Sequence, residues 1–302
     1  MTEDSLAITV SARQWIGLCA LAGGYFIALL DLTIINLAVP SLTRDLSAST
    51  AQVFWAVNSY GLVLALGIIP SGRLGDRFGH RRLFLLGTIV LAAASLVCGV
   101  ATSPFVVIAS RFLQGLGAGM LVPQTLTLIG VTFPENIRGR AVGIWGSIAG
   151  TASVIGPLAG GVLIDGLSWR WVFFINLPIA ILVVVLGLRS LPVEVVRSVR
   201  VDFVGTFLAG IGLVALLYGC LQGPHVGWDP LTIACLPFAV FCLFAFFRYE
   251  RRVDPAYAVF PQSLRKNPRF LTAAVFGLFV ALGVFALTFL VSNYIQSVMG
   301  QT

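Results

Sequence analysis

Two ionisable residues lie inside long apolar stretches of the sequence, where a charge is costly. Asp31 is about two-thirds of the way along the stretch Ile16–Val39, and Arg111 lies in the stretch Phe105–Val131. A charge at the centre of a bilayer costs about 2.5–3.5 kcal/mol on insertion scales, so it persists where it faces water, pairs or is protonated. Removal from water favours the neutral carboxyl, which makes Asp31 a candidate proton carrier. Arg111 cannot shed its proton and needs an anion, water or carbonyl groups.

Each of these residues also has a purely structural interpretation. Asp31 could lie near the outer interface and hydrogen-bond Thr33 or Asn36. Arg111 could extend its guanidinium toward the interface along its apolar stem. The sequence leaves both interpretations open for each residue.

The elements that must position these residues are membrane helices. Hydrophobic residues make up 58% of the 302 residues and charged residues only 10%, which excludes a soluble globular protein. Crossing the hydrocarbon core takes about 20 apolar residues, and in lipid each such segment must be a helix. We therefore predict an all-α polytopic membrane protein. The nine expected spans are Ile16–Val39, Val53–Ile69, Leu83–Val100, Phe105–Val131, Ala141–Ile164, Trp171–Leu188, Phe203–Leu221, Leu231–Phe247 and Phe270–Val291.

The connections divide these spans into three expected parts. Residues 1–192 form an N-terminal six-span bundle, residues 193–249 hold two inserted linker spans, and residues 250–302 hold a charged cytoplasmic linker and one further span. A weak inverted repeat lies within the first part. Gly72-x-Leu74-x-Asp76 recurs as Gly161-x-Leu163-x-Asp165, and Arg81 recurs at the same offset as Arg170. Inverted repeats of three spans are typical of secondary transporters.

The basic residues predict the orientation of the chain in the membrane. If residues 72–82 lie in the cytoplasm, all but three of the 19 basic residues also lie on that side. The exceptions are Arg44 and Arg170 outside and Arg111 within a span. This asymmetry obeys the positive-inside rule. We expect a multi-pass protein with a cytoplasmic N-terminus, and the net charge of +7 reports topology, with no nucleic-acid partner expected.

Two glycine-rich segments have features that a helix bundle can use. In the Gly72–Arg82 segment, glycines favour a tight turn between two helices, and arginines hold the cytoplasmic edge. In the fifth span, Gly146-x-x-x-Gly150 and Gly156-x-x-x-Gly160 allow close helix contact. Pro157 removes a backbone hydrogen bond there.

Several motifs together resemble one family, the Major Facilitator Superfamily, and within it the fourteen-span drug:proton antiporter branch. The motifs are Leu-Asp-x-Thr-Ile-x-Asn-x-Ala around Asp31, Gly-Arg-Leu-Gly-Asp-Arg-Phe-Gly from Gly72, Arg111-x-x-Gln114-Gly115, Gly156-Pro157-x-x-Gly160-Gly161, and Trp169-Arg170-Trp171 continuing to Asn176-x-Pro178. The resemblance covers almost the whole chain. It departs mildly at His80, where the family usually has Arg or Lys.

The resemblance implies a proton-coupled secondary transporter that exports drugs or other small organic compounds across the cytoplasmic membrane. Its partners would be a small organic substrate, protons and the lipid bilayer. The site residues that it implies fall into three groups. For proton coupling and the substrate cavity they are Asp31, Asn36, Arg111 and Gln114; for a cytoplasmic latch they are Gly72, Gly75, Asp76, Arg77, Gly79, Arg81 and Arg82; for a pivot helix they are Gly150, Gly156, Pro157, Gly160 and Gly161.

An alternative function concerns the length of the sequence. A complete member of that branch has further spans after the ninth, so this chain would be C-terminally truncated, with an incomplete second bundle. The alternative is a transport-inactive fragment, or a half-transporter that needs a separate C-terminal half. Alternating access needs two bundles that move around a central site.

Other chemistries find little support in the sequence. Gly75-x-x-x-Gly79 lacks the Lys-Ser or Lys-Thr of a nucleotide-binding loop. The five cysteines show no C-x-x-C spacing, and His80 and His225 are far apart. We therefore expect no enzyme activity, no cofactor and no metal site.

Overall fold

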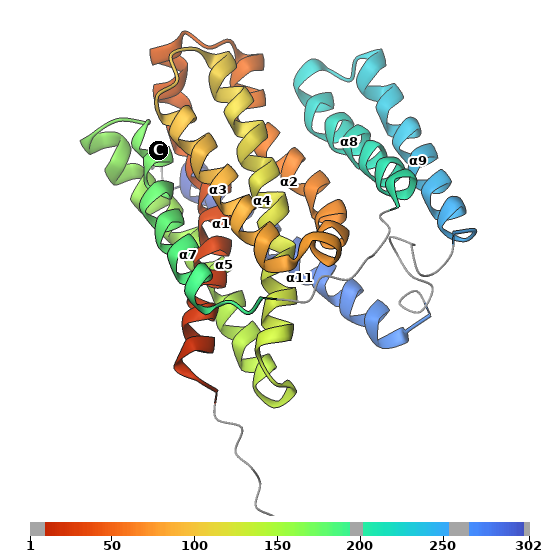
Figure 1. Cartoon of the computed structure of the whole chain (residues 1–302). Coiled ribbons are helices and arrows are strands. Elements are labelled where there is room, and N and C mark those ends of the chain that lie inside the picture. Colours follow the sequence, from red (N-terminus) through yellow and green to blue (C-terminus); the bar gives the residue numbers. More distant parts are fainter. Residues whose placement is uncertain (1–9, 194–201, 254–265, 299–302) are drawn as a thin grey trace, which may run out of the picture.

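The computed structural model describes residues 10–193, 202–253 and 266–298, and in those ranges the regular structure is helical (Figure 1). The helices are α1 (Ala12–Leu46), α2 (Thr50–Phe78), α3 (His80–Gly99), α4 (Pro104–Thr132), α5 (Glu135–Gly166), α6 (Trp171–Phe174), α7 (Asn176–Ser190), α8 (Phe203–Val226), α9 (Pro230–Glu250) and α11 (Pro268–Val298). Parts of the two charged linkers expected from the sequence, residues 194–201 and 254–265, lie outside the described residues.

The helices confirm the expected all-α membrane architecture. Within the described residues, eight segments are long and apolar enough to cross a membrane, and they coincide with the first eight expected spans. The ninth falls on α11, whose apolar stretch in the described part is the shorter Pro268–Val280. The sixth span differs from expectation because it is divided: α6 ends at Phe174, and α7 begins at Asn176.

Short polar residues start several of these helices. Ser11 and Ser49 each accept from the backbone N–H of a glutamine three residues later, and each glutamine side chain in turn accepts from the serine N–H. This capping box satisfies donors that a helix start leaves open. Asp202 caps α8 by accepting from Gly205 N–H, and Asp229 caps α9 by accepting from Thr232 N–H.

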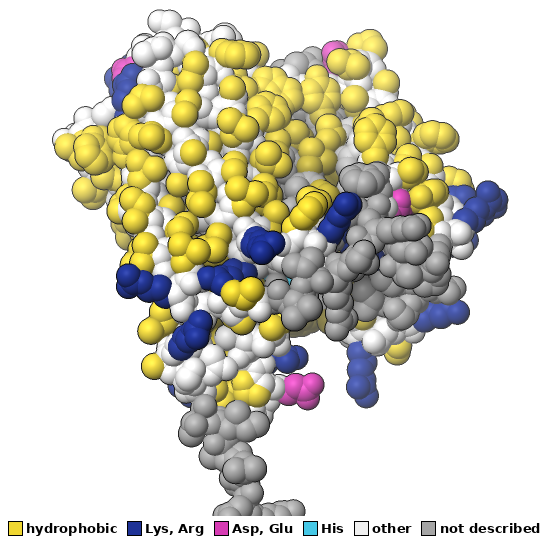
Figure 2. All heavy atoms as spheres, viewed as in Figure 1, with side chains coloured by type: hydrophobic (Ala, Val, Ile, Leu, Met, Phe, Trp, Pro, Cys, Tyr) yellow, Lys and Arg dark blue, Asp and Glu magenta, His cyan; other side chains and the backbone are white. Residues whose placement is uncertain are grey.

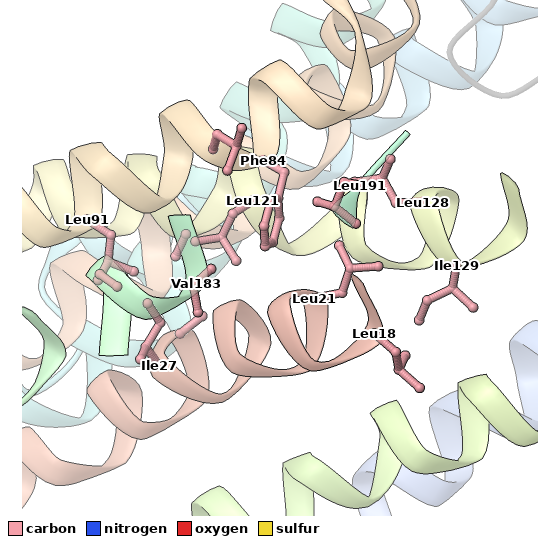
Figure 3. Packing of buried hydrophobic residues seen from close by; sticks show 14 of the residues in the cluster. Leu18, Leu21, Ile27, Phe84, Leu91, Leu121, Leu128, Ile129, Val183 and Leu191 are labelled. Carbon is pink, nitrogen blue, oxygen red and sulfur yellow. The ribbon is translucent and has the colours of Figure 1, made fainter. Parts of the chain in front are cut away.

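The first six spans pack as one bundle, in which α1 lies between α5 and α7, and α4 contacts α2 and α3. Figure 3 shows part of its buried core, where Leu21 of α1 lies near Leu128 of α4, and Ile27 of α1 lies near Val183 of α7. Helix α4 approaches α3 closely at a glycine. A Cβ at Gly117 would meet backbone atoms of α3, so only glycine fits this contact.

Helices α8 and α9 pack mainly on each other, and α8 also touches α2 (Figure 1). At one end of the pair, the Tyr249 hydroxyl donates to Asp202 Oδ1 at 3.0 Å.

The Gly72–Arg82 segment is mostly helical, which corrects the expected loop. Helix α2 continues through Pro70, Gly72 and Gly75 to Phe78, and a single residue, Gly79, separates it from α3. Gly79 has φ 96°, a backbone conformation that glycine adopts without strain. Two of the glycines from which we expected a turn, Gly72 and Gly75, thus lie within a helix.

The two arginines of the inverted repeat make matching contacts at opposite ends of α3 and α7. Arg81, at the start of α3, donates to Leu188 O near the end of α7. Arg170, just before α6, donates to Ala101 O, which follows the end of α3. Cations next to the free carbonyls of a helix C-terminus are stabilising. The equivalence inferred from sequence therefore corresponds to equivalent contacts.

The surface separates apolar and basic side chains. On the face shown in Figure 2, hydrophobic side chains cover a broad band, and most Lys and Arg side chains gather toward the end where α1 begins. This distribution is what the predicted orientation requires.

Candidate functional site

Four helices of the bundle, α1, α3, α4 and α7, bring polar side chains to one buried point. Asp31 Oδ2 accepts from Arg111 Nη1 at 2.5 Å. Asp31 Oδ1 accepts from Asn176 Nδ2 at 2.8 Å and from Gln114 Nε2 at 3.2 Å. Ser95 Oγ accepts from the same two amides, at 2.7 Å from Gln114 and 3.2 Å from Asn176. All five side chains are fully buried, and we call them the polar cluster.

Further contacts fix the Arg111 guanidinium. Its Nε donates to Ala56 O of α2 at 3.1 Å, and its Nη1 also donates to Gln114 Oε1 at 3.2 Å. Its Cζ lies 4.4 Å from the centroid of the Tyr60 ring, a favourable cation–π distance. The Tyr60 hydroxyl in turn donates to Ala28 O at 2.7 Å. Arg111 is therefore held by charge, hydrogen bonds and an aromatic face from three helices.

The ion pair places two opposite charges in the interior of the bundle. Burying two charges carries a desolvation cost that is repaid only by short contacts and further hydrogen bonds, and the polar cluster supplies these. Two polar atoms of the cluster, Arg111 Nη2 and Asn176 Oδ1, still have no hydrogen-bond partner among the described residues. A proton on Asp31 would remove the carboxylate charge that Arg111 faces.

The structure brings together three of the four residues proposed for coupling, Asp31, Arg111 and Gln114. The fourth, Asn36, lies outside the polar cluster: its side chain is exposed and donates to Thr33 O in the same helix. The interpretation that Asp31 bonds Thr33 or Asn36 is wrong, because the Thr33 hydroxyl also donates to backbone carbonyls of α1.

Sequence reasoning missed two members of the polar cluster, Ser95 and Asn176. Both stand in apolar helices, as do several other small polar residues that bond only their own backbone, such as Thr88 to Phe84 O. The available signal was Asn176 itself, a carboxamide early in the sixth span, where an unsatisfied amide would be costly. In the sequence, Asn176 stands out only as part of the motif that runs from Trp169 to Pro178.

The latch residues contribute to a second polar network, at the other end of α2. Asp76 Oδ1 lies 3.2 Å from His80 Nε2, and His80 Nδ1 lies 2.6 Å from Gln124 Oε1. Gln124 Nε2 donates to Ser71 O at 2.8 Å. A Cβ at Gly75 would collide with His80 and Gln124, so the glycine makes room for this contact.

The other latch residues lie around this network. The Arg77 guanidinium is 5.3 Å from the Phe78 ring centroid, Arg82 is exposed, and a Cβ at Gly72 would meet open space. Arg81 bonds α7, as described above. These residues therefore occupy one end of the bundle, far along α2 and α4 from the polar cluster.

The pivot residues of α5 divide into two sets. A Cβ at Gly156 would meet Thr33 and Leu30, and one at Gly160 would meet Leu37 and Ile34; both glycines therefore lie against α1. Gly150 and Gly161 have open space where a side chain would be, and Pro157 is exposed within a continuous helix. Close contact between α5 and α1 thus depends on Gly156 and Gly160.

Comparison with known proteins gives the family. A family model described as Major Facilitator Superfamily matches residues 21–302. The chain belongs to the Major Facilitator Superfamily. It is 37% identical over 292 residues to the puromycin resistance protein pur8 of Streptomyces alboniger, which covers 95% of this chain and 57% of the relative. It is 34% identical over 296 residues to the tetracenomycin C resistance and export protein of Streptomyces glaucescens, covering 96% and 54%.

Solved structures of the superfamily show the same fold. One is a bacterial homologue of the human lysosomal transporter Spinster, with a TM-score of 0.52 at 20% identity, covering 79% of this chain and 61% of that one. A peptide transporter, POT, gives a TM-score of 0.56 at 14% identity, covering 72% and 52%. This superfamily member spans about half the length of the curated relatives it matches.

Proposed function

We propose that this chain belongs to a proton-coupled exporter of small organic compounds, of the fourteen-span drug:proton antiporter branch. The observation that carries the proposal is the fully buried ion pair between Asp31 and Arg111. An intramembrane carboxylate is costly, and a paired one that can be neutralised is suited to carry a proton. The named resistance and export functions of the relatives support export as the direction of transport.

The proposed coupling uses the pair as a two-state element. With Asp31 ionised, the pair joins α1 to α4; with Asp31 protonated, the attraction to Arg111 is weakened and the two helices are freer to separate. A proton gradient then shifts the population of the two states, because it acts differently on each. The substrate would use the same change of state, which makes the exchange obligatory.

The other sequence motifs support the moving parts of this proposal. The Asp76–His80–Gln124 network holds the end of α2 to α3 and α4, where a latch against a second bundle would engage. The close contact of α5 with α1 at Gly156 and Gly160 gives α5 the position of a pivot beside the helix that carries Asp31. The pair α8–α9 supports the fourteen-span assignment. We propose the cytoplasmic membrane, with the N-terminus inside, from the basic residues.

Dye efflux from energised membrane vesicles tests this proposal. We expect Asp31→Asn to abolish pH-gradient-driven efflux, because an amide cannot take up the proton. The matched control is Asp165→Asn, the same change at an exposed carboxyl at the end of α5, which should retain efflux. Efflux by Asp31→Asn equal to that of the parent would refute the coupling role.

The assay includes two forms of the protein, because the chain spans about half the length of its relatives. One is the 302-residue chain alone, and the other is the chain co-expressed with the C-terminal part of a relative. Flux only in the second form would favour a half-transporter, the alternative proposed from the sequence.

A further inference from the structure

Asn176 is the first residue of α7 and joins the sixth span to the polar cluster. We propose that Asn176 is a positioning residue for Asp31, with an amide that can serve both protonation states of the carboxyl. This inference rests on the proposed function, in which Asp31 gains and loses a proton.

The present geometry joins the Asn176 amide to the Asp31 carboxyl. Asn176 Nδ2 donates at 2.8 Å to Asp31 Oδ1, the oxygen that does not face Arg111. A hydrogen bond to a carboxylate is stronger than one between neutral groups, and it favours the charged form of the acceptor. The same Nδ2 also reaches Ser95 Oγ at 3.2 Å, which fixes the amide between two helices.

The other end of the amide indicates the second state. Asn176 is fully buried, yet its Oδ1 has no hydrogen-bond partner in the described part of the chain. A buried acceptor without a partner is costly. Rotation of the amide about its last bond exchanges Oδ1 and Nδ2, so Oδ1 then faces Asp31. In that orientation it accepts the O–H of a neutral carboxyl, which an ionised carboxyl does not offer.

The other amide of the polar cluster, that of Gln114, does not have this freedom. Both ends of the Gln114 amide are occupied, because Oε1 accepts from Arg111 and Nε2 donates to Asp31 and Ser95. Asn176 is therefore the member that can turn without breaking a contact to Arg111.

The charged and titratable groups around Asp31 are few. Arg111 of α4 pairs with it, and Tyr60 of α2 and Cys98 of α3 interact with both charges through space. Helix α6 has no ionisable residue, and the charged residues of α5 and α7 lie within two turns of a helix end. Replacing Asn176 thus changes the hydrogen bonding of Asp31 without changing the charge near it.

Carbodiimide labelling of purified protein tests the inference independently of transport. A hydrophobic carbodiimide reacts with protonated carboxyls, so the labelled fraction of Asp31, measured by mass spectrometry over a pH series, reports its protonation. We expect Asn176→Leu to move the labelling midpoint to higher pH by about 0.5–1 unit, because the lost hydrogen bond to the charged carboxyl is stronger than the one that the neutral carboxyl also loses. Asn176→Ala should do the same, and serves if the leucine variant does not fold. Asn176→Thr, which supplies a hydroxyl donor in place of the amide, should show a smaller shift than Asn176→Leu.

The control is Asn58→Leu, which removes an amide that bonds Phe54 O of its own helix; its midpoint should equal that of the parent. A parental midpoint in both Asn176→Leu and Asn176→Ala would overturn the role of Asn176 while leaving the proposed function intact. A parent whose Asp31 is not labelled at any pH would overturn the proton step of the proposed function, and this inference with it.

Discussion

The two partners of the buried ion pair should differ in what their loss costs. Asp31→Asn leaves the Arg111 guanidinium buried without its counter-charge, and arginine cannot become neutral. Breaking a buried pair by removing one partner costs about 3–5 kcal/mol. Arg111 keeps Ala56 O, Gln114 Oε1 and the Tyr60 ring, so we expect the lower end, about 3 kcal/mol. At about 2 °C per kcal/mol for larger domains, Tm should fall by about 6 °C.

Arg111→Gln should cost less, because the remaining carboxyl can take up a proton. Its cost should also shrink as pH falls, since a neutral Asp31 needs no counter-charge. The double variant should be more stable than the sum of the single losses predicts, which a double-mutant cycle measures as a coupling energy. The assay is thermal unfolding of the detergent-purified chain over a pH series. A smaller loss for Asp31→Asn than for Arg111→Gln would refute this reasoning.

Three further predictions concern single contacts. Gly117→Ala should destabilise the chain by about 1–3 kcal/mol, because its methyl group overpacks the crossing of α3 and α4; Gly146→Ala, which meets open space, is the control and should not lower Tm. Gly75→Ala should separate the side chains of His80 and Gln124, which meet beside Gly75, and should lower Tm although alanine favours helices. An unchanged Tm would contradict the contact. Hydrogen bonds from Thr232 lower the pKa of Asp229 below its usual value near 3.8. The stability that ionised Asp229 contributes is therefore complete above that pH and is lost as the pH falls through the lowered pKa. Unfolding at neutral and at acid pH should show a smaller loss of stability on acidification for Asp229→Asn than for the parent. An equal loss in both proteins would contradict this prediction.

The sequence predicted the spans well because burial in lipid imposes one strong pattern, a long apolar run that must be helical. It also indicated Asp31 and Arg111, since charges in such runs are rare. It could not show that they meet, because contacts between spans depend on packing that single-span patterns do not encode. The same limit hid Ser95 and Asn176, whose residue types are common in membrane helices. The Gly72–Arg82 segment was misjudged because its glycines resemble a turn, whereas Gly75 lies within α2 and leaves room for His80 of α3 and Gln124 of α4.

The matching arginine contacts of α3 and α7 have a consequence for how the bundle can move. Arg81 ties the beginning of α3 to the end of α7, and Arg170 ties the beginning of the sixth span to the end of α3. Because α3 and α7 are antiparallel and are joined at both ends, sliding one helix along the other would break both contacts. Ser95 of α3 and Asn176 of α7 therefore keep their separation as long as both contacts hold. In the proposed coupling, the helix that moves when Asp31 is protonated is therefore α1, which carries Asp31, while α3 and α7 stay joined to each other.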